Sequence, residues 1–318
     1  METKNQPESG IASAMLYYSL LNRPLTNIEL FKFSCSGRTR TFGHFLKTLE
    51  TSPFLFPYIR QFRGFYFFKP TNCAEAFAER QKRGKISQLK WKRAKKIAAL
   101  LQITPFLKMI GITGSLSLAN ANQESDIDLL IALEPGRLWI GRTFITLLLN
   151  LAHWRRHDQK TKDKACLNCY LAGPDMEIKL EIKPRSLHSA QEYSRLIPVW
   201  QKDSSVFSKF QNENSWIGEY LTNYPWPNCL NFETVSKNRL AGIIRGFFEF
   251  IFSGFLGDKL EKILAKWQTK RIQKKIAKTP DPADQIYFSD EYLMFHPRSK
   301  SATILEKHER ILKELSLS

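Results

Sequence analysis

The stretch MIGITGSLSLANANQESDIDLLIAL, residues 109–133, is apolar at both ends and polar in its middle. The apolar ends have the composition of buried strands, and the polar centre predicts a turn, a short helix and a loop between them. Gly114 and Ser115 follow the first predicted strand, while Asp126 and Asp128 lie at the start of the second. We therefore expect polar side chains to gather where the ends of two core strands meet.

Gly114 and Ser115 have the chemistry of an anion-binding turn. Because glycine lacks a side chain, a ligand's phosphates can approach the backbone closely at this position. Ser115 adds a hydroxyl group and the start of a short helix, where backbone N–H groups bind anions. We predict that this turn binds a terminal phosphate.

Asp126 and Asp128 flank Ile127 on the second strand. Because side chains alternate along a strand, both carboxylates point to one face while Ile127 points into the core. Two neighbouring carboxylates repel each other unless a positive charge lies between them. The pair therefore predicts a divalent metal site, with magnesium as the favoured ion.

The pattern Gly-Ser, ten intervening residues and Asp-Ile-Asp resembles the signature of the DNA polymerase beta-like nucleotidyltransferase superfamily. The resemblance implies that Gly114 and Ser115 contact the phosphates of a nucleoside triphosphate. It also implies that Asp126 and Asp128 bind two catalytic Mg²⁺ ions. In such two-metal sites, the ions stabilise the attacking and leaving oxygens.

Members of this superfamily usually supply a third carboxylate from a later strand, as a base or metal ligand. If ACLNCYL (165–171) is that strand, Asn168 holds the position, and an amide cannot act as a base. If MEIKLEIK (176–183) is that strand, Glu177 or Glu181 supplies the carboxylate. We place Glu181 first as the third catalytic residue and leave the alternatives open.

The residues after Gly-Ser depart from the family pattern. Many members carry a basic residue there, whereas this chain has Leu-Ser-Leu at positions 116–118. The charge of a triphosphate would then be met by the metals and by basic residues elsewhere. Arg137 and Arg142 are the candidates.

With 318 residues, the chain exceeds the usual length of one domain. Three predicted helices and an aromatic hairpin occupy residues 1–73, an order typical of a winged helix. An α/β (α+β) nucleotidyltransferase core with a short mixed sheet is expected at 74–198, followed by a mostly helical region at 199–318. The overall order is similar to that of uncharacterised prokaryotic nucleotidyltransferase-domain proteins.

The predicted core begins with a basic helix near residues 75–102. We expect a buried stripe on this helix. Its members are Leu89, Ala94, Ile97, Leu100 and Leu101. The basic residues form either a solvated face or a phosphate-binding face.

The net charge of +18 favours polyanionic partners such as nucleic acids, nucleoside triphosphates or anionic membrane surfaces. The N-terminus lacks the apolar segment of a secretory signal, and a cytoplasmic location is expected. Cys166 and Cys169 form a C-x-x-C pair that we interpret as structural, because no second Cys/His pair follows at zinc spacing.

No transmembrane helix is predicted, because the longest apolar stretches are short and contain charges. Peripheral membrane contact through 242–278 ranks last, because the same pattern suits a helix packed on the rest of the protein.

The sequence therefore predicts a magnesium-dependent nucleotidyltransferase. It would move a nucleoside monophosphate from a triphosphate to an unidentified hydroxyl acceptor and release pyrophosphate. A nucleic acid or another macromolecule is the favoured acceptor. The alternative is a catalytically inactive domain of the same fold that binds nucleic acid through its basic surfaces.

Overall fold

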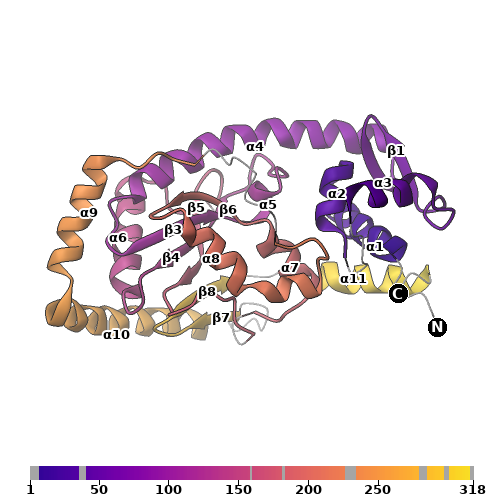
Figure 1. Cartoon of the computed structure of the whole chain (residues 1–318). Helices are drawn as coiled ribbons and strands as arrows, with labels where there is room; N and C mark the ends of the chain where they lie inside the picture. The colour runs from indigo at the N-terminus through magenta and orange to yellow at the C-terminus, as the bar shows by residue number, and fades with distance from the viewer. Residues whose placement is uncertain are drawn as a thin grey trace.

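The computed structural model describes residues 7–35, 41–157, 160–180, 183–225, 234–278, 285–296 and 301–315. They form a mixed α/β structure around a six-stranded sheet (Figure 1). This confirms the predicted α/β class and the mixed sheet.

The N-terminal part consists of three helices followed by a two-stranded hairpin, in the predicted order. The elements are α1 (Pro7–Leu20), α2 (Asn27–Phe33), α3 (Phe42–Thr51), β1 (Ile59–Phe62) and β2 (Phe65–Phe68). Thr26 caps α2, since its side chain accepts a hydrogen bond from the Glu29 N–H and the Glu29 carboxylate accepts one from the Thr26 N–H. This reciprocal pair satisfies two backbone donors that a helix start leaves open.

The basic helix is α4 (Cys73–Leu101), which runs along the top of the molecule in Figure 1. Ala94, Ile97 and Leu101 are buried as predicted. Leu89 is 66% exposed, so its place in the buried stripe was wrong. At 3.6 residues per turn, Leu89 projects from the side of the helix opposite Ala98, which is fully buried.

The central sheet has the strand order β6-β3-β4-β5-β8-β7. The strands are β3 (Leu107–Ile112), β4 (Ile127–Leu133), β5 (Ala165–Leu171), β6 (Ile197–Gln201), β7 (Gln285–Phe288) and β8 (Tyr292–His296). β4 and β5 are parallel, and the other neighbouring pairs are antiparallel. The connection between the parallel strands contains α6 (Leu138–Leu151).

Strand β4 lies in the middle of the sheet and is covered on both faces. Leu129 and Ile131 pack into one cluster with residues of α4 and α6, whereas Leu130 and Ala132 pack into the cluster on the other face. Strands covered on both faces are nearly continuous apolar runs, which explains the sequence IDLLIAL.

The remaining helices surround the sheet. They are α5 (Gly114–Ser117), α7 (Leu187–Ser194), α8 (Ser205–Glu213), the 3-10 helix η2 (Ser215–Glu219), α9 (Arg239–Ile251), α10 (Gly254–Lys278) and α11 (Ser301–Glu314). Helix α11 returns to the N-terminal part, where Nε2 of His308 donates to the carbonyl oxygen of Ser13 at 3.0 Å.

β7 and β8 come from the region expected to be mostly helical, and β6 spans the expected boundary at residue 198.

The predicted strand MEIKLEIK is not a strand over its described residues, 176–180 and 183. The Met176 N–H donates to Oε2 of Glu213 at 2.8 Å, and the Ile178 N–H donates to Oδ1 of Asn214 at 2.8 Å. Side chains at the end of α8 thus take the place of a neighbouring strand as backbone partners. This packing buries Met176 and Ile178, whereas Leu180, the third apolar residue of the alternation, is 62% exposed.

Across the described ranges, we find no single helix with both the length and the apolar character to cross a bilayer.

Candidate functional site: an acidic cluster beside a glycine turn

The turn after β3 brings Gly114 against the start of β4. The Thr113 N–H donates to the carbonyl oxygen of Asp128 at 3.1 Å. Gly114 has φ +64°, a conformation that residues with a Cβ rarely adopt. A Cβ at this position would lie 2.2 Å from Oδ2 of Asp128, so only glycine fits the turn.

Asp126 and Asp128 lie on one side of β4, as predicted, with Ile127 fully buried between them. Sγ of Cys166 joins them: one ligand atom from each of the three residues lies within 4.8 Å of the others. The register explains this meeting, because Asp128 pairs with Cys166 across the parallel strands. All three side chains keep part of their surface exposed to solvent.

On β5, Cys166 and not Asn168 is the residue that pairs with Asp128. Leu129 pairs with Leu167 and Leu130 pairs with Cys169, so Asn168 is the extra residue of a bulge. A bulge changes which side chains face a given partner, and periodicity alone does not reveal it. The structural interpretation holds for Cys169, which is buried, but Cys166 lies in the acidic cluster.

The glutamates proposed for the third position lie elsewhere or are not described. Glu177 forms an ion pair with Arg185 at 2.8 Å. Glu181, our first choice, lies outside the described residues. Glu192 on α7 is an acidic residue that the sequence analysis missed, and its charge raises the pKa of Asp128.

Arg156 is a second residue that the sequence analysis missed. Its Nη1 lies 2.6 Å from Oδ2 of Asp126 and 3.6 Å from Sγ of Cys166. The parallel strands β4 and β5 begin at the same end of the sheet. Arg156 precedes β5 in the chain. The Arg156 N–H donates to the carbonyl oxygen of Ala165 at 3.0 Å, which brings this residue alongside the start of β5, and residue type and spacing do not predict that contact.

Arg137 and Arg142, the predicted phosphate-binding arginines, have other partners. Arg137 forms an ion pair with Asp258 at 2.7 Å. Arg142 donates to Gln268 of α10. Both side chains therefore contribute to the contact between α6 and α10, and Arg156 takes the place beside the carboxylates.

Burial and neighbouring charges shift the pKa values of the side chains in the cluster. Burial, followed by the charges of Asp126 and Glu192, raises the pKa of Asp128 to about 7. Burial, followed by the charges of Asp128 and Asp126, raises the pKa of the Cys166 thiol above its usual range. Burial alone would lower the pKa of Arg156, but Asp126 and Cys166 raise it. The cluster therefore holds more negative charge than Arg156 alone compensates.

Helix α4 supports the loop that leads to Asp126. Nζ of Lys90 is the donor to the carbonyl oxygens of Gln123 and Ser125 and to the carboxylate of Asp163. Lys90 is only 3% exposed, so it is a structural residue of the basic helix. The Ala121 N–H donates to Oγ of Ser87 at 3.2 Å. These bonds fix the loop between the glycine turn and the two carboxylates.

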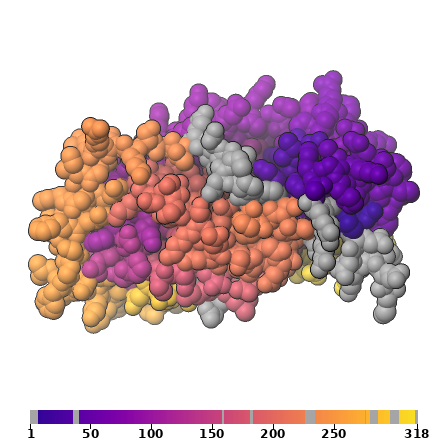
Figure 2. Space-filling model, in the orientation of Figure 1, coloured from indigo at the N-terminus to yellow at the C-terminus, as the bar shows by residue number. Residues whose placement is uncertain are grey.

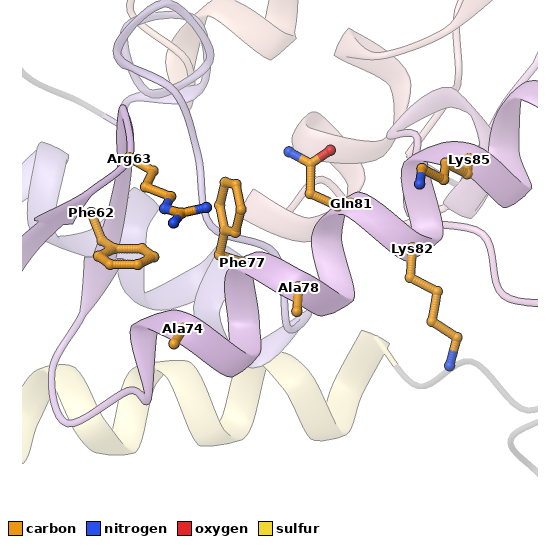
Figure 3. Close-up of a pocket in the computed structure, with 8 residues that line it drawn as sticks. All are labelled: Phe62, Arg63, Ala74, Phe77, Ala78, Gln81, Lys82 and Lys85. Atoms are coloured by element: carbon orange, nitrogen blue, oxygen red, sulfur yellow. The ribbon is translucent and has the colours of Figure 1, made fainter.

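A separate hollow of about 580 Å³ lies between the β1–β2 hairpin and the start of α4 (Figure 3). The guanidinium of Arg63 lies between the rings of Phe62 and Phe77, 5.5 Å from each centroid. Lys82 and Lys85 also line the hollow, which contains no acidic side chain. It is therefore a basic, aromatic surface distinct from the acidic cluster.

No family model, curated protein or solved structure matches the chain.

Proposed function

We propose that the chain is a magnesium-dependent nucleotidyltransferase that transfers a nucleoside monophosphate from a triphosphate to a hydroxyl acceptor. The observation that carries this proposal is the position of Gly114 against Asp128. The close approach places a backbone turn without a side chain directly beside the two carboxylates. A triphosphate can then lie against the turn while its metal ions are held by Asp126 and Asp128.

The donor set fits Mg²⁺ through its two carboxylates. Mg²⁺ binds oxygen ligands, prefers one or two carboxylates and retains water and phosphate oxygens as its other ligands. Burial, followed by repulsion from Asp126 and Glu192, raises the pKa of Asp128, and a divalent cation would relieve the repulsion. Bound Mg²⁺ would supply charge stabilisation of the phosphoryl oxygens.

The remaining tasks fall to side chains and backbone groups of this chain. The turn at Gly114 lets the phosphates approach, and the half-exposed Ser115 provides a hydroxyl group beside it. Arg156 is the cation nearest to the carboxylates and can bind a phosphate oxygen when metal displaces it from Asp126. Cys166 is not a general base at neutral pH, because the raised pKa keeps its thiol protonated.

The experiment is a transfer assay with purified protein, MgCl₂ and each labelled nucleoside triphosphate, with and without RNA, DNA or protein acceptors. Pyrophosphate release and label transfer are expected with the wild type. Both should be lost in the Asp126→Asn/Asp128→Asn double variant, while Asp175→Asn is the control for a carboxylate outside the cluster, because Asp175 forms its ion pair with Lys179, at 3.8 Å. Activity that survives the double substitution would overturn the metal assignment.

A second candidate function is nucleic-acid binding by an inactive domain of this fold. It is favoured by Cys166, which stands where a third carboxylate is expected, and by the hollow that contains Arg63, Lys82 and Lys85. Aromatic rings and cations together bind single-stranded nucleic acid. In that case, binding should fall steeply with salt, persist in the double aspartate variant and weaken in Arg63→Ala/Lys85→Ala.

The N-terminal helices and hairpin are proposed to form a winged-helix unit that presents this hollow to the acceptor. The order of elements and the basic hairpin tip support this assignment.

A further inference from the structure

Helix α9 exposes an apolar face. Five large apolar side chains on this helix are exposed by 40–81%. They are Leu240, Ile243, Phe247, Phe250 and Ile251. Their spacing of three and four residues places them on one side of the helix. The opposite side holds Ala241, which is buried.

The apolar face continues around the bend into α10. Phe255 and Leu256, at the start of α10, are 79% and 73% exposed, and Ile263 and Trp267 follow at 55% and 54%. Together with the five residues of α9, they form what we call the apolar corner. Figure 1 places α9 and α10 at the end of the molecule opposite α1 and α3. In Figure 2, α9 and α10 (orange) form the left side of the visible face.

Exposed lysines are interspersed with the apolar side chains of α10. Lys259, Lys266 and Lys270 lie on the same side of this helix as Ile263, at 3.6 residues per turn. Arg271 is also exposed, and its guanidinium lies 4.9 Å from the ring centroid of Trp267. The outer surface of α10 is therefore both apolar and cationic.

Polar contacts on the inner sides hold both helices against the core. Glu261 accepts hydrogen bonds from the N–H groups of Trp139 and Ile140 at 2.6 and 2.8 Å, which anchors α10 to the start of α6. Glu249 accepts a hydrogen bond from the Phe106 N–H at 2.9 Å, which anchors α9. The apolar corner is thus a fixed surface of the folded protein.

We propose that the apolar corner docks on a membrane surface that contains anionic lipids. Apolar side chains enter the boundary between headgroups and acyl chains, while neighbouring lysines are attracted to anionic headgroups. α9 and α10 meet at a bend of 90°, and Glu249 and Glu261 hold their inner sides against the protein, so we expect the pair to lie along the membrane surface. This inference is independent of the proposed transferase activity.

The charge on the corner disfavours a second copy of the chain as the occupant. A two-fold interface through this surface would bring the lysines of α10 close to those of the other copy, and like charges repel. On sequence alone, peripheral membrane contact ranks last, because these apolar residues could pack on the rest of the protein. Their exposure removes that reason.

The test is flotation of the full chain with vesicles of phosphatidylcholine, with and without phosphatidylserine. Binding to the phosphatidylserine vesicles is expected, and it should fall at least about tenfold in Phe247→Ser/Phe250→Ser. Lys259→Glu/Lys266→Glu/Lys270→Glu should weaken binding to the anionic vesicles in particular. Leu89→Ser/Leu151→Ser is the matched control, because both residues are exposed apolar residues outside the corner.

A second measurement tests whether the apolar corner enters the bilayer. Brominated acyl chains should quench Trp267 fluorescence, and this part of the quenching should disappear in Trp267→Phe. Absence of vesicle binding by the wild type, or equal binding by Phe247→Ser/Phe250→Ser, would overturn the proposal. A dimer that this variant abolishes, without any vesicle binding, would assign the corner to a second copy and also overturn it.

Discussion

Gly114 faces Asp128 so closely that a Cβ on the glycine would lie 2.2 Å from Oδ2 of the aspartate. The two residues are far apart in the motif, but β3 and β4 are antiparallel neighbours, and the turn after β3 returns alongside the start of β4. This contact joins the predicted phosphate-binding turn to the predicted metal ligands.

Gly114→Ala should displace the carboxylate of Asp128 and lower Mg²⁺-dependent transfer by about 100-fold, because displacement of a reacting group by about 1 Å has an effect of that order. Gly136→Ala is the matched control: Gly136 also has a positive φ, of +69°, but a Cβ there meets nothing within 4 Å. Both variants should lose about 1 kcal/mol of stability to backbone strain. Equal activities of the two variants would contradict the contact.

Arg156→Gln should increase the affinity for Mg²⁺, because it frees the Asp126 carboxylate from its ion pair. A partly exposed ion pair contributes about 1 kcal/mol, so the dissociation constant should fall about fivefold. Calorimetric titration with MgCl₂ measures it. Arg155→Gln removes an equal charge from the neighbouring position and is the control. Unchanged or weaker Mg²⁺ binding by Arg156→Gln would show that the ion pair does not compete with the metal.

Cys166→Asp should complete a set of three carboxylates, because the register places residue 166 opposite Asp128. Mg²⁺ prefers oxygen ligands to a thiol, so its binding should tighten by at least about tenfold. Cys166→Ser keeps the size of the side chain without the charge, and its Mg²⁺ affinity should stay close to that of the wild type. If Cys166→Asp binds Mg²⁺ no better than Cys166→Ser, position 166 does not face the metal.

His188 should make the stability of the protein depend on pH. Burial, against the smaller effects of Glu192, Lys183 and Arg195, lowers its pKa from 6.5 to about 4. Between these values, the unfolded chain binds a proton that the folded protein does not, so the free energy of unfolding falls as the pH falls. The loss reaches about 3 kcal/mol. Nδ1 of His188 lies 2.9 Å from the Tyr17 hydroxyl, so this residue also joins α7 to α1.

Urea unfolding of the wild type and His188→Gln across this pH range measures the effect. The variant should show a smaller loss of stability toward pH 4. His44→Gln, at an exposed position on α3, should behave like the wild type. A wild-type stability that does not change between pH 6.5 and 4 would contradict the prediction.

Local patterns predicted most of the elements but not all of their partners. The apolar runs at 107–112 and 127–133 formed adjacent strands, and the alternation around Ile127 placed both aspartates on one side, as expected. The same kind of alternation failed at 176–180, where side chains of Glu213 and Asn214 satisfy the backbone instead. Met176 and Ile178 are buried there without a strand, and Leu180 is exposed, so alternation alone specifies neither a strand nor the burial of every apolar residue.

The sequence by itself determined the glycine turn, the pair of carboxylates and the strands that bring them together, because these depend on local conformation and on neighbouring strands. Only the tertiary structure decided what surrounds the pair. The register of β5 against β4 placed Cys166 opposite Asp128, the bulge left Asn168 without a partner on β4, and the same pairing brought Arg156 to Asp126. It also left the apolar side of α9 exposed. Each of these outcomes depends on register and packing between distant segments, which residue type and spacing do not specify.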